Sequence, residues 1–317
     1  MELQEWQKLS DEQRYDYSEE LAAHLPQSVI FRGLRLYCYG DRQLSVALFE
    51  HEGALFSLIP GGPIQLGYEA RNFCPTDEQI ESFQKTAEEY QLDTADIYSY
   101  VQSVTTPARK VTISPMIVEI KPTMIGFEPI SSEELKIQNL LKDYPDSPAA
   151  RIVNCSDLKP DSSYGFKRCQ DSSIAAWQIM RKTYEDIQAG LAAGGLRLLT
   201  FDEWEYACGA GSTTLFRWGD FCPGDRYPDD RSDWKLHLQP NLFGLHIAQD
   251  PYDREIINQK QIFRGGDGGC TICGGYGFFV GWLTLATAYG EADALWYSAE
   301  DLKNISGNIM RRVIPLP

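Results

Sequence analysis

The sequence predicts an α+β fold with short antiparallel strands, packed helices and much irregular loop. Short apolar runs bounded by turn residues cluster in residues 28–59, which is typical of strands. Apolar residues recur at helical spacing in residues 76–103. A third signal is the start of a capped helix at residue 200, followed by glycine-rich and aromatic segments.

The N-terminal part carries clear local signals. Residues 1–27 are expected to form one or two short helices, because apolar and aromatic residues recur loosely up to Pro26. In the strand region that follows, Gly40-Asp41 marks a hairpin turn between two strands. Two further strands are expected on either side of the Pro-Gly-Gly turn at residues 60–62.

Two helical pieces are expected next. The first begins at the capping residues Thr76 and Asp77, and the second covers roughly residues 93–103. Beyond them Val111 and Ile113 alternate with polar residues, which predicts a half-buried strand.

The middle of the chain gives two weaker patterns. Residues 130–170 are rich in Ser, Asp, Pro and Lys, which predicts surface loop with a short helix. Residues 171–193 carry apolar side chains at helical spacing, and Gly194-Gly195 would terminate this longer helix.

The helix expected after Thr200 is better defined. Thr200 and Glu203 form a capping box, in which each side chain satisfies a backbone donor of the other residue. Trp204, Ala207 and Cys208 then lie on one face of the helix, and we interpret Cys208 as a small core residue.

Charge and composition narrow the class of partner. The chain has 317 residues and a formal net charge of −16, so a nucleic-acid backbone would be repelled over most of the surface. No stretch approaches about 20 apolar residues, and the N-terminus lacks the pattern of a signal peptide. We therefore expect no nucleic-acid partner, no membrane span and a cytoplasmic location, with most of the eight cysteines as free thiols.

The run at residues 196–220, LRLLTFDEWEYACGAGSTTLFRWGD, closely resembles the signature of the formylglycine-generating enzyme (sulfatase-modifying factor) family. Weaker matches to that family occur in the same order along the chain, at residues 56–67, 240–246, 263–266 and 311–315. The resemblance implies a variant of the C-type-lectin-like fold. It assigns residues 1–50 to an N-terminal extension and residues 51–317 to the family domain, with a helical insertion at about 74–104.

The resemblance also points to the C-terminal cysteines. Enzymes of this family hold copper with two cysteines, activate oxygen and convert a cysteine of a client sulfatase to formylglycine. Cys270 is in register with the first of these cysteines, whereas the slot of the second holds Gly275. The nearest thiol is Cys273, and Asp267 replaces the Ser of the family motif.

Several chemistries remain open for Cys270 and Cys273. A C-x-x-C pair can chelate one soft metal such as Cu(I), cycle as a redox dithiol, or supply half of a zinc site. The four histidines show no metal-ligand spacing that would complete a zinc site. The alternative is two structural thiols in a glycine-rich loop.

Calcium is the second metal that the resemblance suggests. The Asn-Glu motif near the family's calcium is lost here, and Asp250 and Asp253 are the residues that could substitute for it. A solvated acidic loop is the competing interpretation, and the same applies to the aspartates between Asp220 and Asp233.

These departures from the family pattern favour a non-catalytic protein that binds a protein or small-molecule ligand through loops on a rigid scaffold. The candidate ligand-binding residues are Asp267, Trp218, Trp234 and Trp282. Arg197 and Arg217 are expected to pair with local carboxylates. The alternative function is a copper- or thiol-dependent oxidoreductase that uses Cys270 and Cys273.

Overall fold

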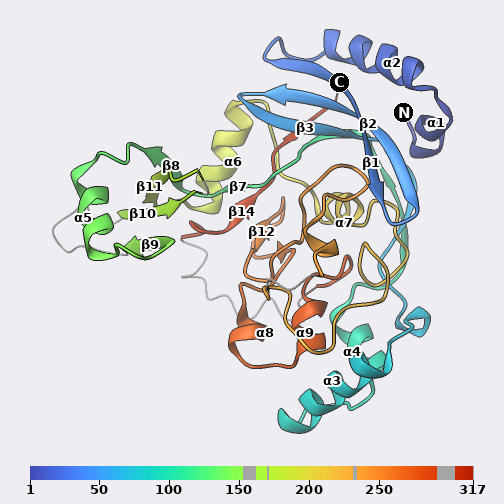
Figure 1. Cartoon of the computed structure of the whole chain (residues 1–317). Coiled ribbons are helices and arrows are strands. Elements are labelled where there is room, and N and C mark those ends of the chain that lie inside the picture. The colour runs from blue at the N-terminus through green and yellow to red at the C-terminus, as the bar shows by residue number, and fades with distance from the viewer. Residues whose placement is uncertain (153–161, 170, 231–233, 291–303, 317) are drawn as a thin grey trace. The chain divides into compact units, whose positions relative to one another are not determined.

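The computed structural model describes the chain except residues 153–161, 170, 231–233, 291–303 and 317 (Figure 1). It confirms an α+β composition with several small antiparallel sheets. The chain divides into two compact units. Unit 1 comprises Met1–Pro122, Leu191–Ala294 and Met310–Pro317, and unit 2 comprises Thr123–Gly190 and Leu295–Ile309.

The main sheet of unit 1 has five antiparallel strands in the order β1-β2-β3-β6-β15. Their bounds are Val29–Tyr39, Arg42–His51, Ala54–Ile59, Met116–Glu119 and Val313–Ile314. The expected Gly40-Asp41 turn joins the first two strands, and Gly40 has the positive φ of 61° that such a turn requires. The sheet therefore combines three consecutive strands from residues 29–59 with β6 and with β15, which are distant in the sequence.

Two helices precede this sheet, as the sequence predicts. They are α1 (Leu3–Lys8) and α2 (Asp11–Ala23), and each begins with a capping box. Trp6 of α1 is fully buried and donates its indole N–H to the carbonyl oxygen of Ser45 at 2.8 Å. This contact anchors the N-terminal helices to β2.

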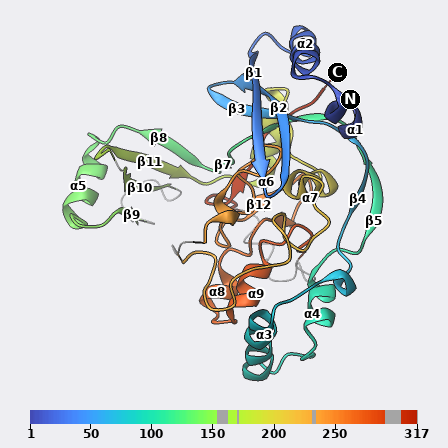
Figure 2. The ribbon, with the colours of Figure 1, turned by 45° about the vertical axis from the view of Figure 1, so that its right-hand side comes forward.

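The two helical pieces expected between residues 76 and 103 are also confirmed. A two-stranded ribbon of β4 (Gly62–Leu66) and β5 (Arg109–Ile113) leads out to them and back (Figure 2). Between these strands lie η1, α3 and α4, with bounds Ala70–Asn72, Asp77–Glu89 and Ile97–Val104. Thr76 caps α3 by accepting a hydrogen bond from the backbone of Gln79 at 3.3 Å.

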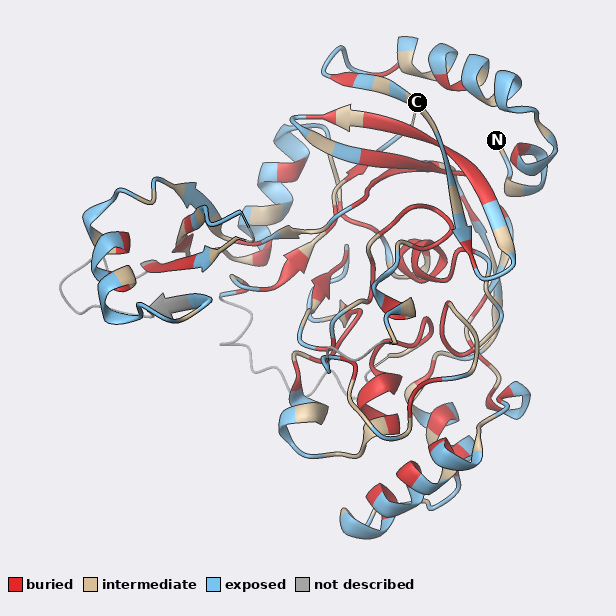
Figure 3. Cartoon of the chain, viewed as in Figure 1, coloured by how far each residue is buried: buried red, intermediate tan, exposed pale blue. Residues whose placement is uncertain are grey.

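The helix of the signature run is α7 (Phe201–Gly209), and its capping box between Thr200 and Glu203 is present. Every residue from Glu203 to Gly209 is buried, including Cys208, so the helix lies inside the core of unit 1 (Figure 3). Asn241 secures its end by donating hydrogen bonds to the carbonyl oxygens of Ala207 and Cys208.

The rest of unit 1 has little regular structure. Its short elements are η2, β12, β13, α8 and α9, with bounds Leu236–Leu238, Glu255–Ile256, Phe263–Arg264, Cys270–Cys273 and Phe278–Leu283. They are followed by β14 (Ile309–Met310). Loops thus carry most of the candidate residues, and the buried helix α7 lies beneath them.

Unit 2 contains strands where the sequence predicts none. Its sheet has the order β8-β11-β10-β9, with bounds Phe127–Ile130, Ile174–Met180, Ser162–Arg168 and Ala149–Ile152. The other elements are β7 (Thr123–Met124) and α5 (Leu135–Asp143), and α6 (Tyr184–Ala193) continues into unit 1.

The expectation of one long helix at residues 171–193 is therefore wrong in its first half, where β11 lies, whereas α6 confirms a helix that ends before Gly194-Gly195. At 130–170 the expected short helix is present as α5, but β9 and β10 lie where loop is expected. Strand β11 pairs along its length with β10 and also with β8, so both neighbours supply partners for its backbone. A short run of apolar residues is compatible with a helix or a strand, and only the pairing of β11 with β10 and β8 distinguishes the two.

Candidate functional site

The glycine-rich segment at residues 265–277 is a loop whose backbone needs glycine. Gly265, Gly266, Gly268, Gly269 and Gly275 all have positive φ. A Cβ at Gly266 would lie 2.2 Å from the carbonyl oxygen of Asp253. The glycines thus allow this loop to pack closely against the neighbouring loop around Asp253.

Asp267 organises this loop from the inside. Its side chain is 2% exposed and accepts hydrogen bonds from the backbone N–H groups of Gly269 and Thr271, both at 2.8 Å. The hydroxyl of Thr271 also donates to it. Both carboxylate oxygens are therefore engaged with the segment in which α8 begins, and Asp267 positions the cysteines.

Cys270 and Cys273 lie at the two ends of the single-turn helix α8. Neither residue is in a disulfide bond, and both are exposed. The hydroxyl of Tyr252 lies 3.6 Å from the sulfur of Cys273. This hydrogen bond is the main reason that the pKa of Tyr252 rises to about 12. The structure thus brings the two predicted cysteines into one turn and adds a tyrosine to them.

The helical insertion holds the far end of the same loop. Tyr90 donates to the carbonyl oxygen of Gly274 at 2.8 Å, and its ring stacks on Tyr276 with centroids 4.3 Å apart. The backbone N–H of Gly277 donates to the hydroxyl of Thr86 at 3.0 Å. Helix α3 is therefore part of the framework that supports α8.

Asp250 and Asp253 occupy one turn. The backbone N–H of Asp253 donates to the carbonyl oxygen of Asp250 at 3.1 Å. Burial, followed by the charges of Asp250 and Glu255, raises the pKa of Asp253 to about 6. Glu255 itself is paired with Arg311 at 3.2 Å.

No group of three or more His, Cys, Asp or Glu residues in the described part of the chain is arranged to hold a metal. Asp250 with Asp253, and Cys270 with Cys273, are therefore two-residue sets. Of the other acidic candidates, Asp220 accepts a hydrogen bond from the backbone of Leu215 at 2.8 Å, whereas Asp233 lies outside the described residues.

The three candidate tryptophans meet in one aromatic cluster with His237. The ring centroids of Trp218 and Trp234 are 5.6 Å apart, and those of Trp234 and Trp282 are 5.0 Å apart. The imidazole of His237 stacks on Trp234 at 5.4 Å and meets Trp282 edge-on at 4.9 Å. The fold thus brings Trp282 together with Trp218, Trp234 and His237, which lie more than 40 residues earlier in the chain.

The cluster has a buried base and a half-buried top. Trp282 is 1% exposed and donates its indole N–H to the carbonyl oxygen of Arg226 at 2.8 Å. His237 is equally buried, and burial, with the nearby charge of Arg217, lowers its pKa to about 4. Trp218 and Trp234 are only partly covered, so they are the members that a ligand can reach.

The two arginines of the signature run behave differently. Arg197 pairs with Glu203 at 2.7 Å, which confirms the expectation of a local carboxylate partner. Arg217 has no carboxylate partner among the residues that the structure describes: its guanidinium donates to the carbonyl oxygens of Ala248 and His237, and the residue is 1% exposed. In the described part of the chain its expected pairing with a local carboxylate is therefore replaced by bonds to backbone carbonyl groups.

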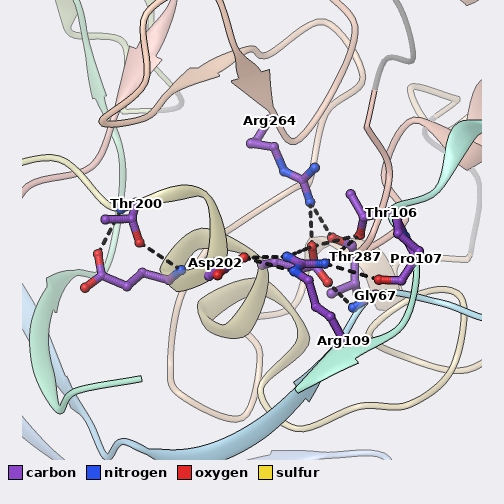
Figure 4. Close-up of polar contacts among 10 residues, drawn as sticks. Gly67, Thr106, Pro107, Arg109, Thr200, Asp202, Arg264 and Thr287 are labelled. Atoms are coloured by element: carbon purple, nitrogen blue, oxygen red, sulfur yellow. Dashed lines mark hydrogen bonds and ion pairs between the residues drawn. The ribbon is translucent and has the colours of Figure 1, made fainter. Parts of the chain in front are cut away.

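Sequence reasoning missed a buried ionic network around Glu205 of α7 (Figure 4). Glu205 accepts hydrogen bonds from the hydroxyl of Thr106 and from Arg109, both at 3.0 Å, and also from the backbone of Gly67. Arg264 lies 3.5 Å from the same carboxylate. The network ties α7 to the β4–β5 ribbon and to β13. In the sequence only Glu205 itself, as a second glutamate two residues after Glu203, could have indicated it.

None of the helices in the described part of the chain combines the length and apolar character needed to cross a bilayer. The chain matches no protein-family model, and no curated protein matches it significantly.

Proposed function

We propose that this chain is a divergent relative of the formylglycine-generating enzymes with a C-type-lectin-like scaffold, and that it binds a protein or small-molecule ligand without catalysis. The scaffold proposal is supported by the family-like motifs, which fall in family order on α7, the adjoining loops and β13. We also propose a cytoplasmic location, since exposed cysteines that form no disulfide suit a reducing compartment.

The observation that carries the binding proposal is the cluster of Trp218, Trp234, Trp282 and His237. Partly covered indole rings that rest on a buried aromatic base form a rigid platform, because packing fixes their orientation before a ligand arrives. Large aromatic side chains also contribute much of the binding energy in protein interfaces. Hydrogen bonds from Trp282 to the carbonyl oxygen of Arg226 and from His237 to that of Pro228 tie the base of the cluster to one neighbouring loop.

The engagement of Asp267 supports a non-catalytic protein. Asp267 replaces the Ser of the family motif, and its carboxylate is occupied by three donors of its own loop. Both of its oxygens are therefore already engaged, which does not favour a role as general base at Cys270.

A copper- or thiol-dependent oxidoreductase is the second candidate. It is favoured by one observation, namely that Cys270 and Cys273 are exposed, are not joined by a disulfide and lie at the two ends of one helical turn. Two thiolates so placed suit Cu(I), which prefers soft sulfur ligands and is the metal that the resemblance implies.

A Cu(I) titration under reducing conditions separates the two functions, with the variant Cys270→Ser and, as matched control, the exposed thiol variant Cys74→Ser. We expect no stoichiometric binding that depends on Cys270. Tight one-to-one binding that is lost in Cys270→Ser and kept in Cys74→Ser would replace the binding proposal with the oxidoreductase.

The platform itself is tested with a library of small aromatic compounds monitored by ligand-observed NMR. Binding should be lost in Trp218→Ala and kept in Tyr144→Ala, which removes an exposed aromatic ring of unit 2. Hits that persist in Trp218→Ala would place the binding surface elsewhere.

A further inference from the structure

A cavity of about 290 Å³ opens beside Trp218, between the tip of the β1–β2 hairpin and the loop after α7. Its lining includes Tyr39, Asp41, Arg42, Ser212, Arg217 and Trp218. All of these residues belong to unit 1. The volume is close to the lower end of the range for small-molecule sites.

Arg217 distinguishes this cavity. Among the described residues, Arg217, Arg264 and Arg311 are fully buried arginines. Arg264 has Glu205 at 3.5 Å and Arg311 has Glu255 at 3.2 Å, whereas no described carboxylate lies within ion-pair distance of Arg217.

The positive charge of Arg217 is thus only partly compensated. Two carbonyl oxygens accept from its terminal nitrogens, the ring of Trp218 lies 4.9 Å away, and its Nε has no acceptor among the described residues. A buried cation without an opposite charge costs free energy, and an anion that enters the adjoining cavity lowers this cost.

The charged residues that line the cavity also favour a negatively charged ligand. Asp41 contributes one negative charge, and Arg42 and Arg217 contribute two positive charges, so the local sum is +1 on a chain whose formal net charge is −16. His237 adds no positive charge at neutral pH, because its pKa is about 4. Thr213 and Ser212 provide hydroxyl groups at the rim.

We propose that this cavity binds a small organic carboxylate, with the carboxylate directed toward Arg42 and Arg217 and the apolar part against Trp218 and Leu236. Arginine suits this group because its planar donors match the two oxygens of a carboxylate. The proposal rests on the proposed binding function and names its ligand class.

The test compares benzoate with benzamide, which has a similar shape and no charge. The probe is the ¹H–¹⁵N signal of the Trp218 indole, assigned with Trp218→Phe. We expect benzoate to shift this signal saturably, and benzamide to bind at least about tenfold more weakly. No saturable shift at about 20 mM benzoate, well above the millimolar affinity expected of so small a ligand, overturns the proposal.

Variants of single arginines show which positive charge binds the carboxylate of benzoate. Arg217→Gln should lower the affinity for benzoate at least about tenfold and Arg42→Gln about threefold, whereas Arg71→Gln, at a site 79% exposed, should leave it unchanged. If Arg217→Gln does not fold, Arg42→Glu decides, and benzoate binding that persists in it contradicts the proposal.

Failure of this inference and failure of the proposed function give different results. Equal binding of benzoate and benzamide at Trp218 refutes the carboxylate preference and leaves the aromatic platform in place. Copper binding that depends on Cys270 refutes the binding function and is measured without either probe.

Discussion

The carboxylate of Asp267 accepts hydrogen bonds from both the backbone N–H and the hydroxyl of Thr271, four residues further along the chain. Together with the bond from Gly269, these contacts hold the segment in which α8 starts. The orientation of Cys270 and Cys273 thus depends on a side chain that is itself buried.

Replacing Asp267 with Ala should destabilise unit 1 by about 1–3 kcal/mol, because three donors lose their acceptor in a buried loop. Urea unfolding gives the free energy. The matched control is Asp225→Ala, since Asp225 is exposed and pairs with its neighbour Arg226. Its effect should stay within about 0.5 kcal/mol. Equal losses in both variants would show that Asp267 does not organise the loop.

Gly266→Ala should cost more than about 3 kcal/mol, since Gly266 has a φ of 145° and its new Cβ would lie 2.2 Å from a backbone oxygen. Gly33→Ala is the matched control, with a φ of 101° and no atom within 4 Å of the new Cβ. It should cost only about 1 kcal/mol of backbone strain. Thermal unfolding of both variants measures the difference, and similar melting temperatures would contradict the close packing described for Gly266.

Glu205→Ala should destabilise unit 1 by about 3–5 kcal/mol, because it leaves Arg264 buried without its carboxylate. The matched control is Glu81→Ala on the surface of α3, where Glu81 pairs with Lys85 at 2.9 Å. Exposed pairs of this kind contribute less than about 1 kcal/mol. Chemical denaturation compares the two variants. A loss in Glu205→Ala no larger than in the control would mean that the ionic network does not stabilise the fold.

Asp253 should make the folded chain more stable at acidic pH than at neutral pH. Its pKa is raised from 3.8 to about 6 in the folded chain, so the folded state holds this proton more tightly than the unfolded state. The resulting stabilisation is present below about pH 4 and is lost as the pH rises through about 6.

The variant Asp253→Asn removes this dependence. Relative to the original chain it should gain stability between about pH 4 and pH 6, by on the order of 1–2 kcal/mol after solvent screening. Denaturation at a series of pH values measures the gain. Asp96→Asn is the control. Because the pKa of Asp96 is lowered from 3.8, the difference in stability between Asp96→Asn and the original chain should change with pH only below that value. Parallel curves for Asp253→Asn and the original chain would refute the prediction.

Local signals predicted much of unit 1. The capping box at Thr200, the cap at Thr76, the Gly40-Asp41 turn and the two helices between residues 76 and 104 are all present. Such features depend on hydrogen bonds between residues a few positions apart, so the residue types alone indicate them. Unit 2 lacked signals of this kind, because strand β11 depends on partners elsewhere in the chain.

The candidate site likewise has some features that the sequence predicted and others that it did not. Cys270 and Cys273, with their spacing of three, and the glycines around them could be recognised from the sequence. The hydrogen bond of Tyr252 to Cys273, the meeting of three tryptophans around His237 and the network of Glu205 could not, because each joins segments that are far apart in the sequence.

The sequence by itself indicated where the capped helices α3 and α7 begin, where the β1–β2 hairpin turns and which residues carry thiols. Only the tertiary structure decided which charges find a partner: Arg197 acquires Glu203 six residues away, whereas Arg217 is surrounded by carbonyl oxygens from Ala248 and His237. The physical reason is that a buried charge is stabilised by whatever polar groups the fold brings within a few ångströms, and proximity in space is set by the packing of the whole unit.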